Sequence, residues 1–173
     1  MAESERTRVR ERGPIDKADY EQALEKTQEF SRRQRTGQIV IKRSDRPTQV
    51  TRQGRLLYYL LPGVYKEVPL QDWAVFINDV RTHSGKHRHQ GGLVIYVLEG
   101  KGYSIVDEER VDWEKGDLLL LPIRPGGVEH QHFNSEPGKG CQWVAFLHWP
   151  TMEHLAMELT QVEESPDFKA LQK

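Results

Sequence analysis

From residue 37 onward the chain consists of short apolar runs separated by turns rich in glycine and proline, and this spacing is what most restricts its fold. Turn pairs such as Pro62-Gly63 and Gly91-Gly92 are typical of tightly connected strands. Strands that arrive roughly every 8–12 residues predict an all-β sandwich or small barrel. The predicted strands are Gln38–Lys42, Arg55–Leu61, Trp73–Val80, Leu93–Leu98, Tyr103–Val106, Arg110–Trp113, Leu118–Leu121, Glu129–Asn134 and Gln142–Trp149.

Residues 1–36 differ from this region because they hold 17 charged residues and few bulky apolar ones. We expect residues 1–13 to be disordered. The helical spacing of Tyr20, Leu24 and Phe30 predicts a helix from Pro14 to about Arg33. This segment is either a solvated helix with one docking face or an arm that reaches a second subunit.

The rest of the chain divides into a barrel domain with its C-terminal extension, residues 37–163, and a polar tail, residues 164–173. A short helix is predicted within residues 151–159. The predicted strands Arg55–Leu61 and Leu93–Leu98 are apolar on both faces, whereas a lone sandwich buries only one face of each strand. The sequence therefore predicts a homodimer.

The balance of charge argues against several classes of partner. The chain has 25 Lys and Arg against 26 Asp and Glu, which removes the electrostatic argument for nucleic acid or an anionic membrane surface. Its single cysteine, Cys141, cannot form an internal disulfide and fits a reducing compartment. No apolar run approaches the roughly 20 residues of a membrane span, and the charged first residues do not form a signal peptide. We therefore expect a cytoplasmic protein that acts on a small molecule.

Four of the seven histidines occur as two closely spaced pairs, His87 with His89 and His130 with His132. On an extended chain, side chains two residues apart point to the same face. Each pair therefore presents two imidazoles together, as a shared metal requires. Asn134 continues the second series on the same face.

The residues around both pairs resemble the two paired motifs of the cupin superfamily. The matching segments are Gly85–His89, Tyr96–Gly100, Trp113–Asp117, Pro122 and Gly127–Asn134. The resemblance covers about residues 80–149 and implies a jelly-roll β-barrel that holds a metal between its two sheets. By position, it implies that the metal ligands are His87, His89 and His130.

The chain departs from the usual cupin pattern at Leu93, where many members place a glutamate ligand. Either three histidines hold the metal, or the barrel has lost its metal and kept a binding pocket. The three-histidine pattern is similar to that of gentisate and 1-hydroxy-2-naphthoate dioxygenases. The resemblance thus implies a ring-cleaving type of non-heme Fe(II) dioxygenase that uses O₂.

The charge of such a site suggests what its substrate would be. Neutral imidazoles leave the charge of a divalent metal uncompensated, which favours an anionic chelating substrate. A hydroxylated aromatic acid or a related enol or diketone has this chemistry. Mn, Ni or Zn remain alternatives to iron, because imidazoles bind most first-row divalent ions.

Four further residues are candidates for work on the substrate. His132 is predicted to act as a base or hydrogen-bond donor without binding the metal, the alternative being a structural histidine. Trp143 is predicted to stack on an aromatic ring, and Arg81 or Arg124 to pair with a carboxylate. Two other function classes stay open, namely a non-catalytic cupin that binds a small molecule and a metal-dependent isomerase, hydrolase or lyase.

Overall fold

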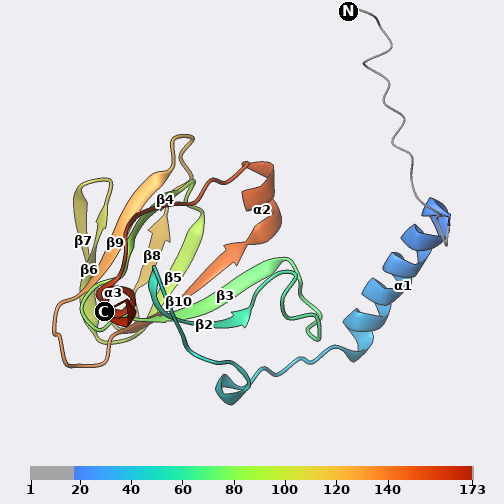
Figure 1. The fold of residues 1–173 in the computed structure, drawn as a ribbon, viewed down its shortest axis with the longest axis horizontal. Coiled ribbons are helices and arrows are strands. Elements are labelled where there is room, and N and C mark those ends of the chain that lie inside the picture. The colour runs from blue at the N-terminus through green and yellow to red at the C-terminus, as the bar shows by residue number, and fades with distance from the viewer. Residues whose placement is uncertain (1–17, 173) are drawn as a thin grey trace, which may run out of the picture.

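The computed structural model describes residues 18–172, which form two antiparallel sheets with helices at both ends of the chain (Figure 1). The first sheet has the order β1-β2-β3-β10-β5-β8. Its strands are β1 (Gln49–Thr51), β2 (Gly54–Leu60), β3 (Trp73–Asp79), β10 (Gln142–His148), β5 (Leu93–Glu99) and β8 (Leu118–Leu121). The predicted all-β fold is therefore confirmed.

The second sheet has the order β11-β4-β9-β6-β7. Its strands are β11 (Thr160–Glu163), β4 (Lys86–His89), β9 (Val128–Asn134), β6 (Lys101–Val106) and β7 (Glu109–Glu114). The histidine-bearing strands β4 and β9 are direct neighbours in this sheet, although about 40 residues separate them in the chain.

Alternating side chains of both sheets build the core between them. Leu56, Phe76, Ile95 and Ala145 come from the first sheet and Trp113 from the second, and all five are buried in one cluster. The alternation of buried and exposed positions along β5 and β8 follows from the period of two of a strand. Burial of this apolar surface supplies the main driving force for closing the two sheets on each other.

Three α-helices flank the sheets, namely α1 (Asp19–Thr36), α2 (Trp149–His154) and α3 (Pro166–Leu171). The predicted N-terminal helix is present and continues to Thr36, whereas the predicted disordered residues 1–13 and the predicted start of the helix lie outside the described residues. Helix α1 projects away from the sheets (Figure 1). No helix within residues 18–172 is long and apolar enough to cross a membrane.

The predicted strand Gln38–Lys42 is wrong. These residues are extended but unpaired and lead into a short 3₁₀ turn, Arg43–Asp45. Strand β1 pairs with residues 54–56 of β2 in their place. Ile39 is left 85% exposed.

The C-terminal segment is more ordered than a polar tail. Strand β11 pairs with β4. Ser165 is the N-cap residue of α3. Its hydroxyl accepts a hydrogen bond from the backbone N–H of Phe168 and donates one to the carbonyl of Thr51. The backbone N–H of Ser165 also donates to the carbonyl of Arg52. These bonds fasten the segment to the turn between β1 and β2.

Candidate metal centre

Strand pairing brings the two histidine pairs together. His87 lies directly opposite His130 in the antiparallel register of β4 and β9. His89 follows His87 on the same face of β4, because side chains two residues apart on a strand share a face. Three imidazoles thus point from neighbouring strands into the space between the two sheets.

The three rings form a compact, buried cluster. One nitrogen from each of His87, His89 and His130 lies within 4.8 Å of the other two. The ring centroids are 4.2 Å apart for His87 and His130 and 4.9 Å apart for His89 and His130. The exposed fraction of His130 is only 1%.

Burial keeps these imidazoles neutral. It lowers the pKa of His87 to about 4, and with help from the neighbouring His87 it lowers the pKa of His89 to about 4. The pKa of His130 is lowered well below its usual value, first by burial and then by the surrounding histidines. A neutral imidazole has a free lone pair, which is the form that binds a metal.

Two rings are already oriented for a metal. Nδ1 of His87 lies 3.3 Å from the carbonyl oxygen of Gly85, and Nδ1 of His130 lies 3.1 Å from that of Val128. A neutral imidazole that donates Nδ1–H to a carbonyl has its lone pair on Nε2. The donor set therefore fits a divalent first-row ion at these two positions without rearrangement.

The third ring is held differently. The backbone N–H of Gly91 donates to Nδ1 of His89, with 3.0 Å between the nitrogens. That bond places the proton of the neutral ring on Nε2, so metal binding there requires the proton to move to Nδ1. The Nδ1–H of His89 and the backbone N–H of Gly91 would then face each other. Metal binding therefore requires the Gly91 amide to move away from Nδ1, in a turn where Gly91 and Gly92 both have positive φ, a region that glycine enters without strain.

We therefore expect metal binding to alter the Gly91 amide. Titrating Zn²⁺ into metal-free protein should shift the ¹H–¹⁵N signal of Gly91 and speed its hydrogen exchange, since the bond to His89 is lost. Gly116, which also has positive φ but lies in the turn before β8, is the matched control and should not respond. Metal bound at full occupancy with an unaltered Gly91 signal would contradict this coupling.

A cavity of about 160 Å³ opens beside His87 and His89. Among the described residues, no lining side chain is acidic or carries the fixed charge of lysine or arginine. Leu93, at the position of the missing glutamate, is buried and forms part of the wall. The lining residues are Gln53, Tyr58, Leu61, Ala74, Phe76, His87, His89, Leu93, Leu147, Trp149, Met157 and Leu159.

The three predicted substrate-binding residues are not part of that lining. Trp143 is buried in the core, where its ring packs against His132 with 4.8 Å between centroids. Arg124 pairs with Asp107 on the surface, and Arg81 is exposed. In their place, the cavity presents two polar groups that the sequence analysis did not single out.

These two groups are Tyr58 on β2 and Gln53 in the turn before it. Burial raises the pKa of Tyr58, so its hydroxyl keeps its proton and remains a hydrogen-bond donor. Along β2, Tyr58 alternates with neighbours that face outward. This alternation was the sequence signal that could have placed Tyr58 on the inner face. Nothing in the sequence indicated that β2 would lie across from the histidines.

His132 lies deeper than the three clustered rings and is fully enclosed. Its Nδ1 is 2.7 Å from Oγ of Ser104, and the indole N–H of Trp113 donates to that same oxygen at 2.9 Å. Because Ser104 Oγ accepts from Trp113, its own hydrogen is free to be donated to His132. Burial lowers the pKa of His132 to about 3, so the ring is neutral, and where the Ser104 hydroxyl donates to Nδ1 the proton lies on Nε2. His132 is not among the residues that line the cavity, and its role as base or hydrogen-bond donor stays a prediction.

Comparison with protein families and curated proteins gives the following similarities. Residues 76–147 match the family model described as the cupin domain. An uncharacterized protein of Methanocaldococcus jannaschii is 33% identical over 84 residues, which are 47% of this chain and 66% of that protein. A gentisate 1,2-dioxygenase of a Streptomyces species is 33% identical over 95 residues, 54% of this chain and 25% of that enzyme. An acireductone dioxygenase of Phaeosphaeria nodorum is 33% identical over 67 residues, 36% of this chain and 37% of that enzyme.

Solved structures share the same architecture. A mutant salicylate 1,2-dioxygenase of Pseudoaminobacter salicylatoxidans in complex with gentisate aligns with a TM-score of 0.52 and 18% identity, over 85% of this chain and 38% of that chain. The polyketide cyclase RemF of Streptomyces resistomycificus aligns with a TM-score of 0.53 and 16% identity, over 79% and 94%. These likenesses concern the fold. The chain spans only about a quarter to two thirds of the curated proteins it matches.

Proposed function

We propose that this chain, which contains a cupin domain over residues 76–147, binds one divalent metal through His87, His89 and His130 and acts as a non-heme iron dioxygenase. The observation that carries the proposal is the buried cluster of three neutral imidazoles beside a cavity of substrate size. The names of two relatives, gentisate and acireductone dioxygenase, support oxygen chemistry. Ferrous iron at this site would supply positions for substrate oxygens and for O₂, together with its redox change.

The cavity favours a small substrate. Its volume of about 160 Å³ is comparable with apolar cavities of roughly 150 Å³ that admit benzene. A single aromatic ring or a short enol or diketone fits this space better than a naphthalene. Leu61, Leu93 and Leu147 provide apolar walls that would exclude water from the reacting centre.

The charge of the cavity narrows the substrate further. Since none of the described residues that line it is a lysine or arginine, a negative charge on the substrate would have to be balanced at the metal. The substrate would therefore carry its anionic oxygens at one end, chelated, with an apolar remainder. The protonated hydroxyl of Tyr58 provides a hydrogen-bond donor to orient it.

Metal analysis and an oxygen electrode test this function. Protein purified without chelator is expected to hold about one divalent ion per chain. With Fe²⁺, it should consume O₂ with gentisate, salicylate or 2,4-pentanedione at least about tenfold faster than with 1-hydroxy-2-naphthoate, because the larger ring overfills the cavity. Zn²⁺-loaded protein is the matched control and should consume none. Fe²⁺-loaded protein that binds these compounds without O₂ uptake would instead identify a non-catalytic binding cupin.

A further inference from the structure

The face of the first sheet that points away from the core is apolar across five adjacent strands. The registers of β2, β3, β10, β5 and β8 align its side chains in two parallel rows. The rows are Leu60, Val75, Phe146, Val94 and Leu120, and Leu57, Ile77, Val144, Tyr96 and Leu118. No charged residue interrupts either row.

The part of this outer face toward β8 is open to solvent, whereas Leu57, Ile77 and Val144 in the second row are buried within the chain itself. The exposed fractions are 58% for Leu118 and 60% for Leu120 on β8, and 42% for Tyr96 on the neighbouring β5. Isolated exposed apolar residues are normal in a soluble protein, but a contiguous apolar face marks a surface that is covered by something else.

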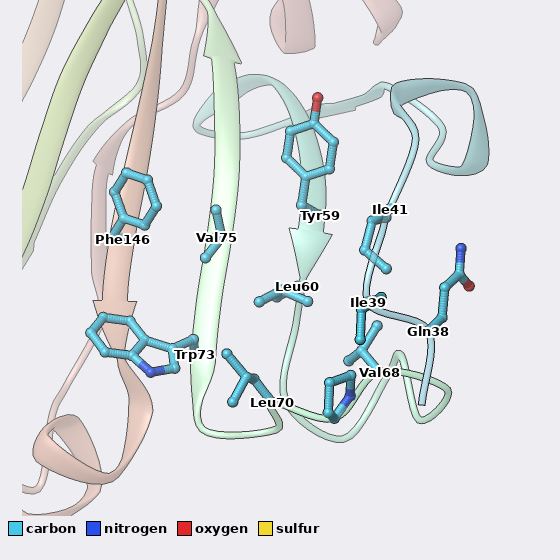
Figure 2. Close-up of a pocket in the computed structure, with 11 residues that line it drawn as sticks. Gln38, Ile39, Ile41, Tyr59, Leu60, Val68, Leu70, Trp73, Val75 and Phe146 are labelled. Carbon is cyan, nitrogen blue, oxygen red and sulfur yellow. The ribbon is translucent and has the colours of Figure 1, made fainter. Parts of the chain in front are cut away.

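At the β2 end, the outer face deepens into a groove of about 660 Å³ (Figure 2). Figure 2 shows Ile39 and Ile41, from the segment after α1, on one side of the groove and the outward residues of β2 and β3 on the other. Among the described residues that line it, none is charged. Val75 and Phe146 belong both to the groove and to the first row, so groove and outer face form one continuous surface.

The size of the outer face can be compared with what a stable complex needs. Five strands about 4.8 Å apart are roughly 20 Å wide, and a similar length along the strands gives a projected area of about 400 Å². A standard interface buries about 800 Å² on each partner. The outer face would therefore supply about half of an interface, and a second apolar element is needed to complete it.

Helix α1 offers that element. It has no buried side chain, and its apolar residues Tyr20, Leu24 and Phe30 fall within an arc of roughly 120° around the helix. Its first turn is acidic and its last turn carries Arg33 and Arg35. Two copies of such a helix have complementary charges when they cross antiparallel, the arrangement given by a twofold axis perpendicular to the helices.

We propose that a second copy of this chain covers the outer face, forming a twofold homodimer in which the two outer faces pack together and each α1 crosses to the partner. The groove is lined in part by the segment that follows α1, so α1 and the outer face belong to one interface. The metal centre lies on the opposite, inward side of the first sheet. The inference is therefore independent of the proposed function.

Sedimentation equilibrium on the full chain at micromolar concentration tests the proposal. The expected mass is twice that of the 20.1 kDa chain. Leu120→Lys places a charge at the exposed β8 end of the first row and should raise the dimer dissociation constant by about 30-fold or more, and Leu24→Lys should also raise it. The matched control is Val111→Lys on β7 of the other sheet, a 38% exposed apolar residue outside the interface, which should leave the dimer intact.

Two outcomes would overturn the proposal. One is a wild-type protein that stays monomeric at these concentrations. The other is a dimer that Leu120→Lys and Val111→Lys affect equally, because the interface would then lie elsewhere. Circular dichroism and zinc content of each variant, expected to match the wild type, separate loss of the interface from loss of the fold.

Discussion

Replacing His130 with alanine is expected to release the metal almost completely. His130 faces His87 across the pairing of β4 and β9 and lies within 4.9 Å, centroid to centroid, of both other rings. Its loss leaves two imidazoles, one of which must also change tautomer. Changes in groups that merely support a ligand cost about 10–100-fold in metal affinity, so loss of a ligand should cost more than 100-fold. Zinc affinity measured by competition with a chelating dye checks this.

His148→Ala is the matched control for that experiment. His148 is half-exposed at the end of β10, where its Nδ1 contacts the hydroxyl of Thr151, and it is not among the clustered histidines. We expect its zinc affinity to equal that of the wild type. If His130→Ala retained zinc as tightly as His148→Ala, the three clustered imidazoles would not be the ligand set.

Replacing His132 with alanine is expected to leave the metal in place and reduce O₂ uptake by about 10²–10⁴-fold. His132 is two residues beyond His130, about 6–7 Å along the strand, and its ring is 5.5 Å from that of His130, centroid to centroid. When the Ser104 hydroxyl donates to Nδ1, the neutral ring carries its proton on Nε2 and is a hydrogen-bond donor there. Positioned donors and acids typically contribute rate factors of this size. Metal content and turnover should be measured on the same preparation.

Two companion variants separate a donor from a packing role. His132→Gln retains an N–H group and should recover part of the rate, while Ser104→Ala removes the group that fixes the tautomer and should lower turnover with unchanged metal content. Loss of metal in His132→Ala would show that His132 is a ligand. Full activity in His132→Ala would identify it as a structural histidine.

The sequence predicted the clustering of the histidines better than it predicted the residues around them. The period of two in each histidine pair is a local property, so the shared face of His87 and His89 follows without knowledge of the fold. The pairing of β4 with β9 is non-local, and here the family resemblance supplied what spacing alone could not. Arg124 illustrates the limit, because its partner Asp107 lies in a distant turn that no local pattern connects to it.

The edges of the sheets were the least predictable part. Strands β1 and β11 are short and rich in Gln and Thr, so they lack the apolar alternation that marks inner strands. The run Ile39, Val40 and Ile41 has strong strand propensity, yet it pairs with no described strand, and β1 takes only residues 54–56 of the β2 edge. Propensity describes what a segment tolerates, whereas pairing depends on the rest of the fold.

The position of β11 has a consequence for the order in which the centre forms during synthesis. Strand β4 carries two of the clustered histidines, and β11 protects its outer edge. Because β11 is made roughly 70 residues after β4, a growing chain exposes an uncovered ligand strand until nearly all of this segment has left the ribosome. The edge of β4 is therefore open to pairing with neighbouring chains until that strand has been made.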